Sequence, residues 1–252
     1  RDEMEFILFA PDDGRPRGPL IVNATQPAQM LSLGGNLISL RLTVSHSDNG
    51  DSLLAVEIAS GPDPIRSGTW ELQAVPQWVG SEDKRLHVWV ESLCDDGGNR
   101  PIRFDNPDPR HTLSIPGTAE TVITVAACDG SAQMAAFSAL GRTRVNGPKP
   151  DVCAPGCNIL AAAANAASNS SQPMSGTSMS APQVAGLMLL AMSRREKQVA
   201  AGQQTKQLCA NELRGALLRS ASGRHVPYSP DNGFGMIHAA DFMRQVTLNH
   251  HP

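Results

Sequence analysis

Residues 175–182 read Ser-Gly-Thr-Ser-Met-Ser-Ala-Pro, and an apolar run with helical spacing follows them directly. The apolar residues recur at steps of three and four: Val184, Leu187, Met188 and Ala191. This period predicts a helix over residues 179–197, with Pro182 in the first turn, where proline is tolerated. The stretch is therefore expected to bring a serine, Ser178, to the beginning of a helix.

A serine at the beginning of a helix can act as a nucleophile. Such a serine needs exposure, a neighbouring base and a donor for the oxyanion. The first N–H groups of a helix have no intrahelical partner, so the N–H of Ser178 can face a developing oxyanion. Gly176 is expected to allow tight turning and close approach of a substrate chain, and the small Thr177 leaves room for it. The alternative is a helix N-cap, the commoner role of Ser or Thr before a helix.

Residues 106–252 alternate between buried strands and helices. Continuous apolar runs predict two strands that are buried on both faces, at residues 121–127 and 157–161. A second helix is expected over residues 211–221. Buried strands that alternate with helices indicate an α/β layer built on a parallel sheet.

Residues 1–105 have a different pattern, in which apolar and polar residues alternate. A period of two, typical of strands, occurs at residues 40–44, 54–59, 70–73 and 86–91. Asp48-Asn49-Gly50 is a turn signal that favours a hairpin between the first two segments. We therefore predict an all-β antiparallel sandwich, and residues 105–109, rich in Asp and Pro, as its boundary with the α/β part.

The serine stretch resembles the Gly-Thr-Ser-Met-Ala-x-Pro motif of subtilisin-like serine peptidases. Other motifs of that family resemble segments that occur here in the same order: residues 112–125, 136–141, 149–156 and 233–240. The resemblance covers residues 106–246 and has two mild departures, Ser180 for the commoner Ala and Arg142 for a Pro. It implies that residues 106–252 are the C-terminal half of a subtilisin-like parallel-sheet catalytic domain.

The resemblance also implies roles for individual residues. Ser178 would be the catalytic nucleophile, and its backbone N–H would be one oxyanion donor. Gly176 and Thr177 would border the bound substrate. Ser114 would lie near the floor of the primary specificity pocket.

The other members of the triad do not stand where that family has them. The family order is Asp, His, Ser, so both would precede residue 106, and none of His46, His87 or His111 stands in a matching motif. We expect an upstream segment of the same protease to supply the Asp, the His and the oxyanion Asn. The first residues, Arg1 to Glu5, are neither a signal peptide nor an ordinary start, which indicates a fragment or a processed chain.

Residues 1–105 are similar to an inserted domain of some subtilisin-like peptidases. The germination proteases of spore-formers resemble this layout, with a jelly-roll domain between their His and Ser segments. Ser67-Gly68-Thr69-Trp70 looks like the Gly-x-Trp element of such a domain. The resemblance therefore implies a jelly-roll-like β-sandwich insert over residues 1–105.

The composition argues against several other classes. A net charge of −3 gives no electrostatic support for a nucleic-acid partner. No apolar run approaches the ~18 residues of a membrane span. Cys153 and Cys157 suit a disulfide or a metal pair, or else they are small buried apolar residues. Residues 11–14 form an acidic turn that suits structural calcium, but turn chemistry explains it better. The sequence demands no cofactor or metal and does not indicate a localisation.

The sequence thus predicts a serine endopeptidase that cleaves polypeptide substrates by a Ser/His/Asp mechanism, with this chain alone inactive. One alternative is a pseudoprotease that keeps the fold, has lost the Asp or His, and has a regulatory or binding role. Another is a carbohydrate- or protein-binding sandwich whose function rests in residues 1–105. Intact upstream Asp and His would favour the enzyme, and their replacement the pseudoprotease. The low aromatic content, 4%, argues against the binding sandwich.

Overall fold

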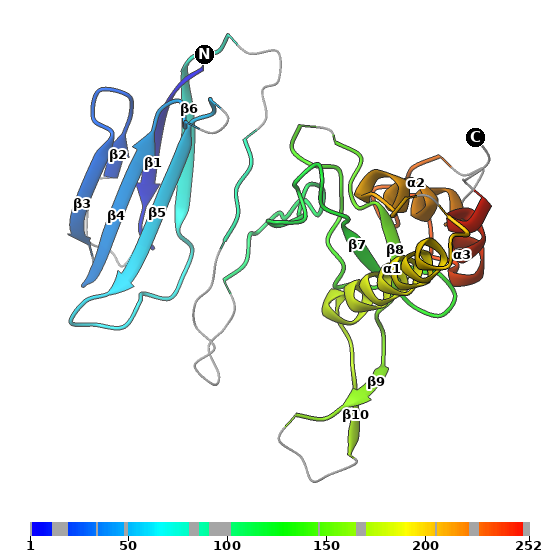
Figure 1. Cartoon of the computed structure of the whole chain (residues 1–252). Coiled ribbons are helices and arrows are strands. Elements are labelled where there is room, and N and C mark those ends of the chain that lie inside the picture. Colours follow the sequence, from blue (N-terminus) through cyan, green and yellow to red (C-terminus); the bar gives the residue numbers. More distant parts are fainter. Residues whose placement is uncertain are drawn as a thin grey trace. The chain divides into compact units, whose positions relative to one another are not determined.

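The chain divides into two compact units, each with a hydrophobic core of its own (Figure 1). Unit 1 comprises residues 1–101 and unit 2 comprises residues 102–252. The computed structural model describes residues 2–11, 20–33, 35–47, 50–80, 86–90, 102–145, 147–164, 170–204, 206–221 and 227–248. None of the helices in these ranges combines the length and the apolar character needed to cross a bilayer.

Unit 1 is an all-β sandwich. Its described strands are β1 (Glu3–Phe9), β2 (Leu20–Val22), β3 (Ala28–Leu33), β4 (Asn36–Thr43), β5 (Leu53–Ser60) and β6 (Glu71–Trp78). They form two antiparallel sheets with the orders β2-β1-β6 and β3-β4-β5. Inward side chains of both sheets share one core: Phe6, Leu8, Leu20, Val22, Ile38, Leu40 and Leu42. Alternation along β4 produces this arrangement, because every second residue faces the core.

The predicted hairpin is present as β4 and β5, with Leu40 opposite Val56. Asp48 and Asn49 of its expected turn lie outside the described residues. The jelly-roll expectation is not confirmed, since the described strands make two three-stranded sheets. The strand predicted over residues 86–91 is wrong for its described part: residues 86–90 form no strand, and Trp89 is 56% exposed. Alternation yields a strand only where a neighbouring strand accepts the hydrogen bonds.

Unit 2 is a small α/β layer (Figure 1). Strands β7 (Val125–Cys128) and β8 (Val152–Pro155) pair in parallel. On its other edge, β8 exchanges backbone hydrogen bonds with residues 234–237: Cys153 N donates to Gly235 O at 3.0 Å, and Ile237 N donates to Cys153 O at 2.9 Å. Strands β7 and β8 form the sheet on which the helices of unit 2 pack.

The helices of unit 2 bury their apolar faces against β8 and against one another. They are α1 (Thr177–Ala200), α2 (Ala210–Ser220) and α3 (Ala239–Leu248). The shared core includes Val152, Ala154, Val184, Leu187, Ala191, Leu213, Leu217, Phe242 and Val246. The helices predicted over residues 179–197 and 211–221 are confirmed as α1 and α2, and α3 was not predicted.

Both strand predictions in unit 2 need correction. The run at residues 121–127 becomes a strand only from Val125. The run at residues 157–161 corresponds to β9 (Ile159–Ala162), which pairs with β10 (Ser171–Met174) in an exposed two-stranded hairpin. Leu160 is 67% exposed there, so β9 is not a buried core strand. The core strand of this region is β8, which comes just before it.

A buried charged cluster joins β8 to α2. Asp151 is completely buried and Lys149 is 3% exposed. The Asp151 carboxylate accepts from Lys149 Nζ at 2.6 Å, from Arg214 Nη2 at 2.7 Å and from the backbone N–H of Thr124 at 2.8 Å. Lys149 Nζ also donates to the carbonyl of Val122. One carboxylate therefore pairs with two cations and fixes the chain just before β7.

Candidate active site

Ser178 is the second residue of α1, and its side chain is exposed. Among the described residues, neither its Oγ nor its backbone N–H has a hydrogen-bond partner. The N–H of Met179 is already used, because it donates to Gly176 O at 3.0 Å. An exposed hydroxyl beside a free N–H at a helix N-terminus suits a nucleophile with its own oxyanion donor.

The first turn of α1 is held to the end of β8 by two polar side chains. Ser180 is completely buried, and its Oγ lies 3.0 Å from Ala154 O and 3.2 Å from Pro155 O, to which it donates. Gln183 Nε2 donates to Pro155 O at 2.7 Å. These contacts fix the helix start, and with it Ser178, against the sheet.

The sequence did not assign a role to Ser180 or to Gln183. Ser180 was noted only as a departure from Ala. Both residues lie near the buried face of a helix whose other inward residues are mainly apolar. Polar side chains at such positions need partners, and this signal was available in the sequence.

Tight packing requires glycine at residue 156 rather than at residue 176. A Cβ on Gly156 would collide with Ser180 Oγ and would lie 2.8 Å from Ala127 Cβ. Gly176 has an extended backbone with φ 161°, and a Cβ there would make only ordinary contacts within the chain. Gly176 lies at a bend directly before α1, but its φ is not one that requires glycine. Its backbone N–H donates to Gly156 O at 2.8 Å, so the two glycines lie together beneath Ser178.

The described histidines of unit 2 are engaged away from Ser178. His111 Nδ1 lies 3.1 Å from Arg142 O, and His238 Nδ1 lies 3.1 Å from Asp241 Oδ2. Neither makes a hydrogen bond to Ser178.

The other proposed substrate-binding residues lie on the surface or at its edge. Thr177 is the first residue of α1 and is half-buried, and Ser114 is exposed in a loop. No hydrogen bond joins Ser114 to Ser178 within the described part of the chain. Its place in a specificity pocket therefore stays a prediction.

The cysteine pair suggested by the sequence is not joined. Cys153 and Cys157 are free thiols, as are Cys128 and Cys209. Cys153 lies with Cys128 in a small buried cluster, and burial raises the pKa of both thiols. Cys94, and Asp12 and Asp13 of the acidic turn, lie outside the described residues. In the parts that the structure covers, no three His, Cys, Asp or Glu side chains are grouped to hold a metal.

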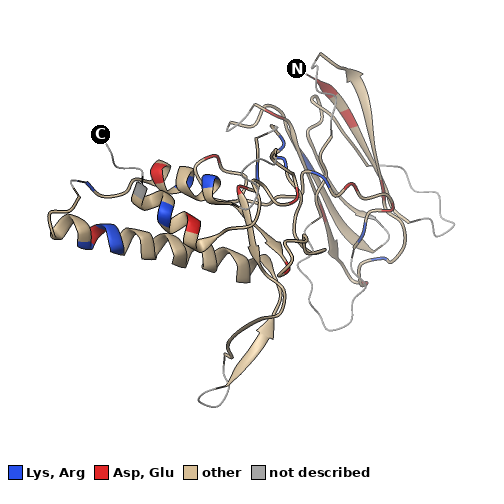
Figure 2. Cartoon of the chain, turned by 90° about the vertical axis from the view of Figure 1, so that its right-hand side faces the viewer, with Lys and Arg blue, Asp and Glu red and all other residues tan. Residues whose placement is uncertain are grey.

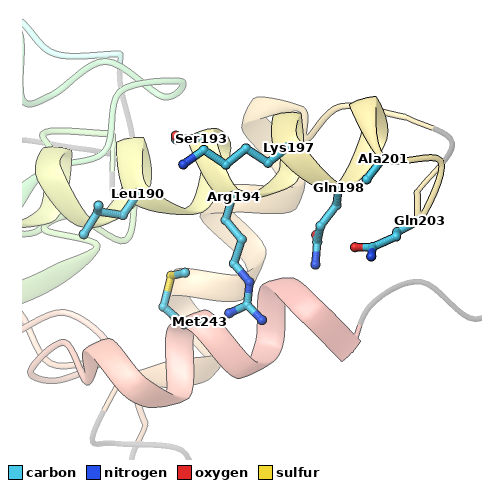
Figure 3. Close-up of a pocket in the computed structure, with 8 residues that line it drawn as sticks. All are labelled: Leu190, Ser193, Arg194, Lys197, Gln198, Ala201, Gln203 and Met243. Carbon is cyan, nitrogen blue, oxygen red and sulfur yellow. The ribbon is translucent and has the colours of Figure 1, made fainter.

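A pocket of about 700 Å³ lies at the other end of α1. Eight residues line it: Leu190, Ser193, Arg194, Lys197, Gln198, Ala201, Gln203 and Met243. Figure 3 shows Arg194 reaching from α1 toward α3, beside Met243. At a rise of about 1.5 Å per residue, the lining begins roughly 18 Å along α1 from Ser178. The pocket is therefore separate from the candidate active site.

Comparisons with known proteins agree with the geometry around Ser178. The sequence model of the subtilase family matches residues 59–236, more than half of the chain. The chain is similar to the C5a peptidase of Streptococcus pyogenes, with 37% identity over 91 residues, which are 36% of this chain and 7% of that protein. It is also similar to Subtilisin-like protease 3 of Saccharomyces cerevisiae, with 35% identity over 108 residues, which are 43% of this chain and 21% of that protein.

A solved structure extends the likeness to the whole chain. The CspB protease of Clostridium perfringens is similar with a TM-score of 0.74 and 24% identity, and the match covers 100% of this chain and 51% of that chain. The chain thus spans about half of that protease and at most 21% of the two relatives above. The fold is that of a subtilisin-like protease domain, represented here in part.

Proposed function

Since the chain belongs to the subtilase family, we propose that it is the serine-bearing part of an endopeptidase that hydrolyses peptide bonds in polypeptides. The observation that carries the proposal is Ser178, exposed at the start of α1 with a free backbone N–H in the described structure. Ser180 and Gln183 support it, since they hold this turn rigidly against β8. A nucleophile is effective only when its geometry is fixed in advance.

The proposed reaction follows the serine mechanism. Ser178 Oγ attacks the scissile carbonyl carbon while a histidine removes the hydroxyl proton, and an aspartate orients that histidine. The oxyanion accepts a hydrogen bond from the Ser178 N–H and from an asparagine side chain. The histidine then protonates the leaving amine, and water hydrolyses the acyl-enzyme by the same steps.

We assign the histidine, the aspartate and the asparagine to polypeptide upstream of Arg1. The described histidines of unit 2 are hydrogen-bonded elsewhere, and the similar CspB protease chain is about twice as long. Gly176, Thr177 and Ser114 are the proposed substrate contacts. On this proposal, residues 1–252 alone lack normal turnover because the base is missing.

The test uses the complete protein, with casein as an unstructured substrate and a fluorophosphonate as a probe for an activated serine. Casein turnover and labelling at Ser178 are expected. Ser178→Ala should lower kcat by about 10⁶-fold and leave peptide binding intact. Full turnover by Ser178→Ala would refute the mechanism. A folded complete protein with neither turnover nor labelling would instead indicate a pseudoprotease.

A control separates the role of residues 1–252 from that of the upstream polypeptide. Residues 1–252 alone should give no casein turnover above background. Robust turnover that Ser178→Ala abolishes would show that the base lies within this chain.

A further inference from the structure

All the charged residues of α1 lie at the end of the helix that is remote from Ser178. They are Arg194, Arg195, Glu196 and Lys197, and Figure 2 shows the rest of the helix uncharged. Arg195 is buried and donates to Val246 O at 2.9 Å. Arg194 and Lys197 are exposed and line the pocket between α1 and α3, whereas Glu196 is not part of that lining. This end of α1 therefore presents two cations to the pocket.

The pocket is an elongated groove along one side of α1. Six lining residues come from this helix and its C-cap: Leu190, Ser193, Arg194, Lys197, Gln198 and Ala201. They recur at steps of three and four residues from one another, so they lie on one face of the helix. At a rise of about 1.5 Å per residue, this row is about 16 Å long. Met243 of α3 and Gln203 complete the lining (Figure 3), and we call the pocket the α1–α3 groove.

The two cations of the groove have no carboxylate partner. Arg194 and Lys197 make no hydrogen bond or ion pair within the part of the chain that the structure describes, and no Asp or Glu lines the groove. Three other exposed cations of unit 2 each pair with a carboxylate: Arg110 with Asp108, Lys206 with Glu212 and Arg244 with Asp241. The groove therefore has a positive charge that its own lining does not neutralise, which favours an anionic ligand.

We propose that the α1–α3 groove binds a short acidic peptide segment of a partner protein in an extended conformation. At about 3.3 Å per residue, a groove of about 16 Å accommodates about five residues of such a segment. Arg194 offers a planar fork that suits a carboxylate, and Lys197, three positions further along the helix, offers a second cation beside it. Ser193, Gln198 and Gln203 supply donors and acceptors for the peptide backbone.

The groove also offers apolar surface to one side chain of the segment. Leu190 begins the row along α1 and is 64% exposed. Met243 reaches the groove from α3 and lies beside Arg194 (Figure 3). An apolar residue next to the acidic ones would cover this surface and gain from its burial.

The charges of the groove indicate that it stays open in the complete protein. Covering Arg194 and Lys197 with polypeptide that brings no counter-charge is strongly unfavourable. The uncharged part of α1, which ends before Arg194, has no such restriction. The groove begins roughly 18 Å along α1 from Ser178, so a partner that is bound there does not cover the serine.

Fluorescence anisotropy with the complete protein tests the proposal without catalysis, so the result is independent of the proposed function. The probe is the labelled peptide Leu-Glu-Glu-Glu-Leu, whose residue order is the same in both directions, and Leu-Gln-Gln-Gln-Leu is the neutral control. The acidic peptide should bind about tenfold or more tightly than the neutral one, and added salt should reduce this difference. Arg194→Glu and Lys197→Glu should each weaken its binding by about tenfold or more. Arg110→Glu makes the same change of charge outside the groove and should leave binding unchanged.

Three results would overturn the proposal. The first is equal binding of the acidic and neutral peptides. The second is an equal loss with Arg110→Glu and Arg194→Glu, because binding would then follow the overall charge and not the groove. The third is displacement of the acidic peptide by inorganic phosphate at matched ionic strength, because the groove would then be a site for small anions. Arg194→Gln keeps a polar side chain and serves as the second variant if Arg194→Glu does not fold.

Discussion

Replacing Asp151 by Asn is expected to destabilise unit 2 strongly. The carboxylate is completely buried and lies 2.6 Å from Lys149 Nζ and 2.7 Å from Arg214 Nη2. Asn keeps the shape but removes the negative charge and turns an NH₂ donor toward groups that are themselves donors. Removing one partner of a buried ion pair costs about 3–5 kcal/mol, because the other charge stays buried without compensation. That is a large share of the roughly 5–15 kcal/mol of a whole domain.

Urea unfolding followed by helical circular dichroism measures the effect. The described helices all belong to unit 2, so this signal reports on the unit that contains Asp151. With a denaturant slope of roughly 2 kcal/mol/M, the expected loss moves the midpoint down by about 1.5–2.5 M. Asp108→Asn is a matched control, since Asp108 also lies 2.6 Å from a cation, Arg110, but at the surface. Its midpoint should not move measurably.

A second variant separates charge from packing. Adding Lys149→Met to Asp151→Asn removes the buried ammonium that has lost its partner, so part of the stability should return. Arg214 is 32% exposed and can turn toward water. If Asp151→Asn shifted the midpoint no more than Asp108→Asn, or if Lys149→Met deepened the loss, the electrostatic explanation of this cluster would be wrong.

Three further predictions concern the anchor of α1, the proposed specificity pocket and the start of α2. Ser180→Ala removes a buried hydroxyl that anchors α1 to β8, so the free energy of unfolding should fall by about 1 kcal/mol; urea unfolding checks this, and no change would contradict it. If Ser114 floors the pocket, Ser114→Leu should shift kcat/KM toward small side chains before the cleaved bond by about ten- to a hundred-fold; an unchanged peptide-library profile would exclude the role. The backbone N–H of Cys209 and the neighbouring Lys206 lower the pKa of Glu212 from 4.5 to about 2. Its stabilisation should therefore be complete above about pH 4.5 and be lost as the pH falls toward 2; unfolding of Glu212→Gln across that range should lack this component.

The sequence predicted the helices of unit 2 well where the apolar period was long. Helix α1 extends over Thr177–Ala200, and its buried apolar residues, Val184, Leu187 and Ala191, are among those that the period indicated. Helix α3 was missed because it has only ten residues, of which Phe242 and Val246 are buried in the core. The helical spacing of apolar residues is present in α3, but it is short and begins within the family motif at residues 233–240.

Strand predictions failed where pairing depends on distant segments. Residues 86–90 alternate as a strand would, but no neighbouring strand pairs with them in the described structure. Strand β9 pairs with β10 in an exposed hairpin, and its partner contains Pro173 and no apolar pattern. The apolar run at residues 157–161 does not by itself show that this pair lies outside the core. The alternation of apolar and polar residues shows which face of a strand is apolar. It does not show which part of the fold covers that face.

The candidate site was predictable at Ser178 and less so around it. The position of Ser178 at a helix start follows from the local sequence. The supports of that turn lie at the end of β8, more than twenty residues earlier. The carbonyl of Pro155 accepts hydrogen bonds from Ser180 and Gln183, and Ser180 packs closely on Gly156. Such contacts depend on which strand lies beneath the helix, and that is a property of the tertiary fold.

The pairing of β8 with residues 234–237 has a consequence for synthesis on the ribosome. The contacts of unit 1 involve residues that emerge early, so its sandwich can close while the rest is still being translated. Strand β8 appears midway, but Cys153 finds its second set of hydrogen bonds only when Gly235 and Ile237 have left the exit tunnel. Until then the nascent serine-bearing layer shows an unpaired strand edge, and a chaperone that holds such edges should bind it more strongly than it binds unit 1.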